Sequence, residues 1–106
     1  MNALALTVLT TTDDETKARD LAAGAIEARL AACAQITGPV TSVYRWQGKT
    51  ETAQEWQVLL KTTPDHYEAL ESWLLETHDY ETPEVIATPV THGSTAYLTW
   101  INEETN

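Results

Sequence analysis

The sequence predicts an α+β domain with the element order β-α-β-β-α-β, followed by a short C-terminal helix. Two observations support this. Apolar residues recur at alternate positions in some runs, which indicates strands, and at every third or fourth position in others, which indicates helices. The two kinds of run also alternate along a chain of 106 residues, which is the length of one domain, here residues 1–106. This order is typical of a ferredoxin-like fold, an antiparallel sheet with both main helices on one face.

The first half of the chain contains a strand, a helix and a long hairpin. Residues 4–11 form the strand, and Thr12 begins a capping box at the start of a helix that runs to Leu30. Two alternating runs, 33–46 and 55–61, flank a glycine-containing turn and predict an antiparallel hairpin. Its arms are long for a small domain, so we expect another subunit to pair with them or cover them.

The second half contains a helix, a strand and a terminal helix. Thr63 is expected to cap a helix that has proline at its first position and ends near His78. Residues 85–90 form a last strand, and its proline places it at a sheet edge or a bulge. Ser94 caps the C-terminal helix, and we expect the polar tail 102–106 to fray. Two main helices leave one sheet face open, which packing of several copies around a closed axis would bury.

Charge and cysteine content exclude several classes of partner. The chain has 16 acidic and 6 basic residues and a net charge of -10. Nucleic-acid binding requires Lys and Arg to neutralise phosphates, and an anionic membrane would repel this chain, so we expect neither partner. Cys33 is the only cysteine, and the first residues form no basic, apolar leader. Both features favour a soluble protein in the cytoplasm.

The segment between the second helix and the last strand is the strongest candidate site. His78, Tyr80 and Glu84 place an imidazole, a phenol and a carboxylate in one short connection. Copper or zinc accepts imidazole, and a carboxylate can complete a partial shell. Two structural alternatives stay open. His78 can cap the end of the helix, and Glu84 can pair with Lys49 or Lys61.

Cys33 is a second candidate ligand. It lies among alanines where the first helix meets the second strand, and a cysteine in such a place is usually a small buried hydrophobe. A metal-ligand or redox role stays open. No phosphate loop, dinucleotide motif or nucleophile–histidine arrangement is evident, so we expect neither an enzyme nor an organic cofactor.

Several segments, taken in order, resemble the CutA family of divalent-cation tolerance proteins. The resemblance extends over nearly the whole chain. The matching segments are Ala31-Ala32-Cys33, TSVYRWQGK at 41–49, LKTT at 60–63, the pattern H-x-Y-x-x-P-E-V-I at 78–86, PVTHGS at 89–94 and Y-L-x-W at 97–100.

This resemblance implies a homotrimer that takes part in the response to divalent metal ions. It implies that copper(II) or another divalent cation binds in clefts between subunits. The residues so implicated are His78, Glu84 and Cys33 as metal ligands, with Trp46, Lys49, Glu55, Lys61 and Tyr80 lining the ligand cleft.

Three positions depart from the family pattern, and one of them is Asp79, which replaces the proline common after the histidine that corresponds to His78. Thr10 and Thr77 stand where some bacterial members have a cysteine and a second, adjacent histidine, and threonine is a poor ligand for copper.

The alternative function is that of a PII-like small-molecule sensor or signalling scaffold without a specific metal site. Its clefts would hold an anionic metabolite with Trp46, Lys49 and Lys61.

Overall fold

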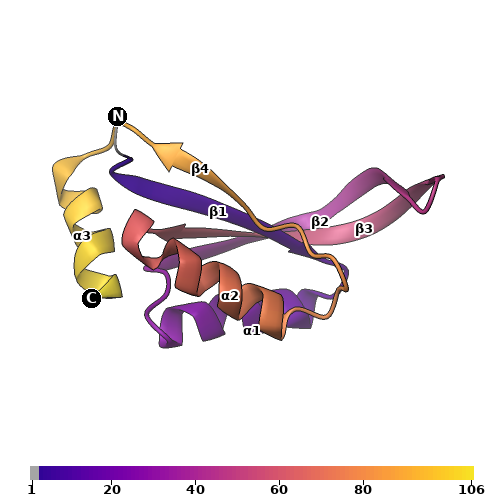
Figure 1. Ribbon diagram of the computed structural model, residues 1–106, viewed down its shortest axis with the longest axis horizontal. Helices are drawn as coiled ribbons and strands as arrows, with labels where there is room; N and C mark the ends of the chain where they lie inside the picture. Colours follow the sequence, from indigo (N-terminus) through magenta and orange to yellow (C-terminus); the bar gives the residue numbers. More distant parts are fainter. Residues whose placement is uncertain (1–2) are drawn as a thin grey trace.

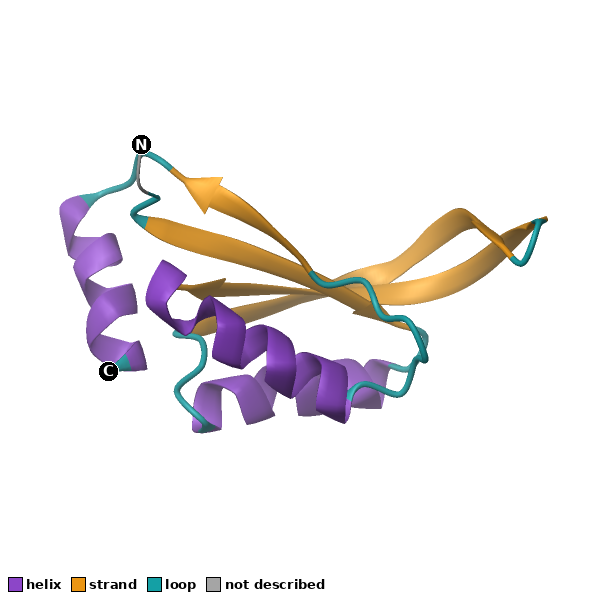
Figure 2. Cartoon of the chain, in the orientation of Figure 1, coloured by secondary structure: helices purple, strands orange, loops and turns teal. Residues whose placement is uncertain are grey.

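A computed structural model describes residues 3–106 and confirms the α+β class (Figures 1 and 2). The elements follow the predicted order, with a single 3-10 turn (η1) added before the second helix. They are β1 (Ala5–Thr12), α1 (Glu15–Glu27), β2 (Cys33–Trp46), β3 (Lys49–Thr62), η1 (Pro64–His66), α2 (Tyr67–Thr77), β4 (Ile86–Val90) and α3 (Thr95–Thr105).

The strands form one antiparallel sheet in the order β2-β3-β1-β4. Helices α1 and α2 lie on one face of the sheet, and α3 stands at the end opposite the tip of the β2–β3 hairpin (Figure 1). The edge strands are β2 and β4, so the prediction that the proline-containing strand lies at an edge is confirmed. Pro89 has no N–H to donate, and an edge position makes this tolerable.

The β2–β3 hairpin is longer than predicted. Both strands have 14 residues, and the first pair next to the turn is Trp46 with Lys49. The two-residue turn between them has positive φ at Gln47 and at Gly48, 50° and 80°. Such turns match the twist of the adjoining strands, so pairing begins at the turn itself and not at residue 55. The hairpin contributes to a molecule that is 44 Å long and 22 Å thick.

The core fills the space between the sheet and the two helices. Strand residues at alternate positions point to this side, and Val8, Val58 and Leu60 are each 0% exposed. Helices α1 and α2 contribute the apolar residues that recur at every third or fourth position on one helix face, which is the pattern that predicted these helices. The buried cluster consists of Val8, Ala18, Leu21, Ala25, Ala31, Val58, Leu60, Leu70 and Leu74.

The predicted start of the first helix is wrong. Thr12 remains in β1, where it pairs with Trp56 and is fully buried, so its side chain is not the N-cap. Asp14 caps the helix instead, because its carboxylate accepts the N–H of Thr16 at 2.8 Å. The helix also ends at Glu27, three residues before Leu30.

The predicted fraying of the C-terminal tail is also wrong. Helix α3, capped by Ser94 as predicted, continues to Thr105. Thr105 is only 3% exposed, and its hydroxyl donates to the carbonyl of Ile101 at 2.9 Å. Burial of Thr105 and Ile101 therefore keeps the last turns helical. In residues 3–106, no helix is both long and apolar enough to cross a membrane.

Gly24 of α1 lies directly against the indole of Trp73 on α2. A Cβ atom added there would lie 2.6 Å from the ring carbon Cζ2 of Trp73 and 2.9 Å from Cη2. Both distances are shorter than van der Waals contact, so a larger residue would force the helices apart or displace the indole.

We therefore expect Gly24→Ala to lower the free energy of unfolding by about 1–3 kcal/mol, although alanine is the better helix former. Urea denaturation at a fixed protein concentration measures the change. In a Trp73→Leu background the same substitution should become neutral or stabilise by up to about 1 kcal/mol. An equal loss in both backgrounds would show that contact with the indole is not the cause.

Thr10 and Thr62 form a natural comparison between an unpaired and a paired buried hydroxyl. Both residues are 0% exposed. The hydroxyl of Thr62 donates to the carbonyl of Leu30 at 2.7 Å, whereas that of Thr10 has no hydrogen-bond partner within residues 3–106. Thr10 therefore carries the cost of burying a polar group without a partner.

Thr10→Val should raise the free energy of unfolding by about 1 kcal/mol, because valine has the same shape without the unpaired hydroxyl. The matched control, Thr62→Val, should lower it by about 1–3 kcal/mol because it leaves the Leu30 carbonyl unpaired. Thermal and urea unfolding would measure both. Destabilisation by Thr10→Val equal to that of Thr62→Val would contradict the assignment.

Candidate functional site

An acidic groove lies where the connector from α2 to β4, residues 78–85, meets the β2–β3 hairpin. It has a volume of about 560 Å³. Four carboxylates contribute to its wall, and neither lysine nor arginine does. We call this surface the acidic groove. It is lined by Thr11, Asp13, Ser42, Val43, Tyr44, Trp46, Ala53, Glu55, Tyr80, Glu81, Thr82 and Glu84.

Glu55 and Tyr80 form the central polar contact of the acidic groove. Glu55, on β3, is 7% exposed, and the Tyr80 hydroxyl donates to its Oε2 at 2.7 Å. Burial raises the pKa of Tyr80 well above its ordinary value, and the hydrogen bond to Glu55 and nearby negative charge raise it further. The phenol therefore stays protonated at physiological pH and acts as a fixed donor to the carboxylate.

His78 attaches the connector to β1. Its main-chain N–H donates to the carbonyl of Leu74 at 2.9 Å, which confirms that this residue ends the helix. The imidazole turns away from the helix end and is 0% exposed. Its Nε2 lies 2.8 Å from the carbonyl oxygen of Thr11, and its Nδ1 accepts the main-chain N–H of Tyr80 at 3.0 Å. One side chain thus joins the start of the connector to the end of β1.

These contacts define the tautomer of His78. A main-chain N–H can only donate, so Nδ1 must accept, and Nε2 carries the proton that is donated to Thr11. The carboxylate of Asp79 lies 3.1 Å from the same Nδ1, but an ion pair there would require a protonated ring. A protonated Nδ1 could not accept from Tyr80, so we do not assign the contact with Asp79 as an ion pair. Neither ring nitrogen retains a free lone pair.

The acidic groove brings together four of the predicted site residues: Trp46, Glu55, Tyr80 and Glu84. Glu84 is exposed, and within residues 3–106 it forms no salt bridge with either lysine that the sequence offered as a partner. The side chain of His78 lies behind the groove and not in its wall.

The remaining predicted residues lie elsewhere in the subunit. Lys49 is at the tip of the hairpin, whereas Lys61 pairs with Cys33 at the other end of β3. Twelve positions separate the two lysines, roughly 40 Å along an extended strand, so one subunit does not combine them in one anion site. Cys33 itself is half-buried. The Lys61 ammonium donates to the Tyr97 hydroxyl on α3 at 3.3 Å, so it is engaged away from the acidic groove.

Sequence reasoning missed one carboxylate of the groove, Asp13, and did not single out another, Glu81, as a ligand. Glu81 lies inside the connector that the sequence singled out, so its position was a usable signal. Asp13 follows β1 and reaches the groove only because β1 pairs beside β3, which no local pattern predicts. Within residues 3–106, no three side chains of His, Cys, Asp or Glu are placed so that they could hold a metal ion.

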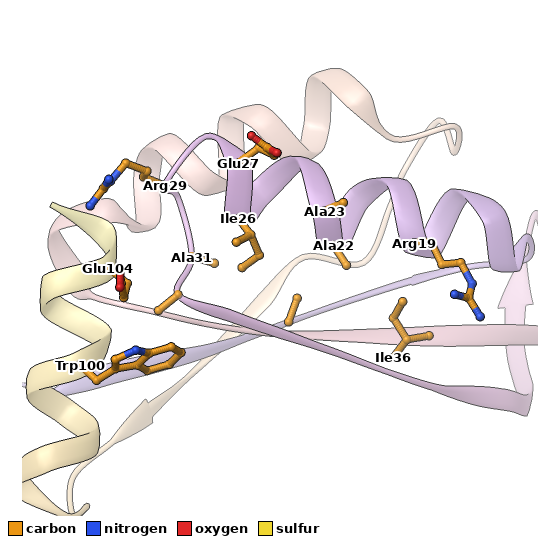
Figure 3. A pocket seen from close by; sticks show the side chains of 12 residues that line it. Arg19, Ala22, Ala23, Ile26, Glu27, Arg29, Ala31, Ile36, Trp100 and Glu104 are labelled. Atoms are coloured by element: carbon orange, nitrogen blue, oxygen red, sulfur yellow. The ribbon is translucent and has the colours of Figure 1, made fainter.

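A second, apolar groove lies between α1, β2 and α3 (Figure 3). It has a volume of about 830 Å³, and we call it the apolar groove. Ile26 and Trp100 face it from two helices and Ile36 from the edge strand β2, while Arg19 and Arg29 lie at opposite ends (Figure 3). Ile36 and Trp100 are 38% and 39% exposed, so a large apolar surface borders an unpaired strand edge.

The fold and the acidic groove define the class, a small α+β protein with a long hairpin and a carboxylate-lined groove beside it. The family follows from comparison with known proteins. The chain matches the model of the CutA1 divalent ion tolerance protein family over residues 6–104, and it belongs to this family.

Relatives and solved structures agree with this assignment. The chain is 48% identical to the divalent-cation tolerance protein CutA of Escherichia coli (strain K12 / DH10B) over 101 residues, which cover 95% of this chain and 90% of that protein. The crystal structure of CutA from Xylella fastidiosa has a TM-score of 0.93 at 40% identity and covers 96% of this chain and 98% of that one. The divalent cation tolerance protein from Thermus thermophilus also has a TM-score of 0.93, at 39% identity, covering 96% and 99%.

The contact between Tyr80 and Glu55 can be tested by a double-mutant cycle. Tyr80→Phe should lower the free energy of unfolding by about 1–3 kcal/mol, because it leaves a buried carboxylate without its donor. Tyr44→Phe, at a residue that is 44% exposed, is the matched control and should have little effect. In a Glu55→Gln background the cost of Tyr80→Phe should fall. Simple additivity would contradict the assigned contact.

Proposed function

We propose that this chain acts as a divalent-cation tolerance protein that binds divalent cations in clefts between the subunits of a homotrimer and has no catalytic activity. The observation that carries the proposal is the acidic groove. Asp13, Glu55, Glu81 and Glu84 line it, and neither a lysine nor an arginine of the described residues contributes to the wall. A divalent cation would neutralise this charge, and carboxylate oxygens are ligands that such ions accept.

The groove of one subunit supplies only part of a coordination shell, which supports a site completed by a second copy. No three potential ligands converge within the described part of one chain. The groove also runs along the half of the hairpin nearest its turn, from Glu55 to Trp46, and the outer strand β2 is an edge of the sheet. A neighbouring subunit that pairs with this edge would approach the groove.

Unpaired edges and exposed apolar residues support the trimer. The 14-residue edge of β2 is unpaired in one subunit, and long exposed edges are normally covered. Leu9, Leu59 and Ile86 are neighbours in register on the sheet face that carries no helix in residues 3–106, and Ile86 is 54% exposed. The apolar groove, between α1, β2 and α3, exposes further apolar side chains. Packing of ferredoxin-like subunits around a closed axis would bury all three features.

The cytoplasm is the proposed location, since the single cysteine fits a reducing compartment. The relative from Archaeoglobus fulgidus, 29% identical with a TM-score of 0.93, is described as a periplasmic protein. Copper, predicted from the sequence, belongs to the same proposal as one of several divalent cations to be tested.

The test combines light scattering with calorimetric titration by Mn(II) and by Cu(II). The proposal expects a mass three times the 11.7 kDa of one chain and saturable binding. Glu84→Gln, in the groove, should weaken binding by about tenfold or more, which is the loss of one charged ligand. Glu76→Gln removes the same charge from an exposed site on α2 and should have little effect.

Equal weakening by both substitutions would contradict the proposal, because it would mean that cations respond only to the overall charge. A monomer in solution would contradict the part that concerns the clefts between subunits.

A further inference from the structure

We infer that His78 is a positioning residue of the acidic groove and not a metal ligand, so that a cation in this groove has oxygen ligands only. This inference rests on the proposed function, since it concerns the ligands of the same site. It differs from the prediction made from the sequence, in which His78 supplies nitrogen to copper.

The donor set of the groove does not fit copper. Copper(II) in proteins is typically held by nitrogen, with sulfur for copper(I), whereas carboxylate and carbonyl oxygens suit manganese, calcium and magnesium. Glu55, Glu81 and Glu84 offer oxygens. Trp46 is the only nitrogen-bearing side chain of the wall, and an indole N–H is a donor without a lone pair for a metal.

His78 is unavailable as a ligand for two independent reasons. Its imidazole is 0% exposed, and both ring nitrogens are used in hydrogen bonds to main-chain groups. Ligation through Nδ1 would leave the N–H of Tyr80 unpaired, and ligation through Nε2 would leave the carbonyl of Thr11 unpaired. Both groups lie in part-buried surroundings, where loss of a partner is costly.

Cys33 does not supply the missing soft ligand within one subunit. It pairs with Lys61, six positions along β3 from Glu55, which is roughly 20 Å in an extended strand. The other two histidines lie outside the wall of the groove, His66 in η1 and His92 after β4.

The positive role of His78 follows from a chain of contacts. The imidazole fixes the main chain of Tyr80, and the two rings pack with their centroids 4.8 Å apart. Tyr80 in turn donates its hydroxyl to Oε2 of Glu55. The carboxylate is thereby oriented on a rigid strand, and Oε1 is left for a cation. His78 thus acts on the ligand through Tyr80, as outer-shell residues do in metal sites.

The experiment uses the full chain and the two ions alone, Mn(II) and Cu(II). Electron paramagnetic resonance of bound Cu(II) should show no nitrogen hyperfine coupling, and the spectrum should be the same in Cys33→Ser. His78→Asn and Tyr80→Phe should each weaken Mn(II) binding by about tenfold, the usual effect of removing an outer-shell partner. The double variant should be no weaker than either single one, because both act on Glu55 by one route.

The outcomes separate the inference from the function on which it rests. Nitrogen coupling in the Cu(II) spectrum that disappears in His78→Asn would overturn the inference and leave cation binding intact. The spectrum is first recorded on the unsubstituted chain, so this outcome does not depend on whether a variant folds. Additive losses in the double variant would also overturn it. If neither ion binds saturably, and if Glu84→Gln does not alter the weak binding that remains, the proposed function itself would be overturned.

Discussion

Strand β1 is the constraint on which both the core and the acidic groove depend. It is the only strand in residues 3–106 whose two neighbours, β3 and β4, come from distant parts of the chain. The side chain of Val8 points from one face of β1 into the core, and the other face of β1 points away from the helices. Its end also supplies the Thr11 carbonyl that the imidazole of His78 binds. A shift of its register would therefore displace the packing and the connector together.

Much of the fold could be predicted because its signals are local. Alternation predicted the strands, helical spacing predicted α1 and α2, and Ser94 was recognised as an N-cap. Thr63 does precede a helical segment, but this segment is η1 and the Thr63 side chain makes no capping hydrogen bond, so its predicted role as the cap of α2 is wrong. The failures came where tertiary contacts override local chemistry. Thr12 has the side chain of a good cap but is held in β1 by pairing with Trp56, so the cap moved to Asp14.

The candidate site was predicted less completely, because its parts come from separate segments. The connector was found as a cluster of polar groups, and the family resemblance added Glu55 and Trp46 from the hairpin. Neither source shows which way a side chain points. His78 looks like a ligand in sequence, yet its ring is turned into the protein, and only the positions of Thr11 and Tyr80 reveal this. The lysines of the predicted cleft likewise lie at opposite ends of one strand.

The separate origin of the groove walls has a consequence for stability. Asp13 follows β1, Glu55 lies on β3, and Glu81 and Glu84 belong to the connector, so these carboxylates come together only in the folded chain. Like charges that line one groove oppose folding when no counter-ion is present. An ion that binds the folded chain and not the unfolded one shifts the folding equilibrium in proportion to the logarithm of its concentration. If the groove holds a cation as proposed, the concentration of that ion would shift the balance between folded and unfolded chain, and with it the exposure of the chain to proteolysis.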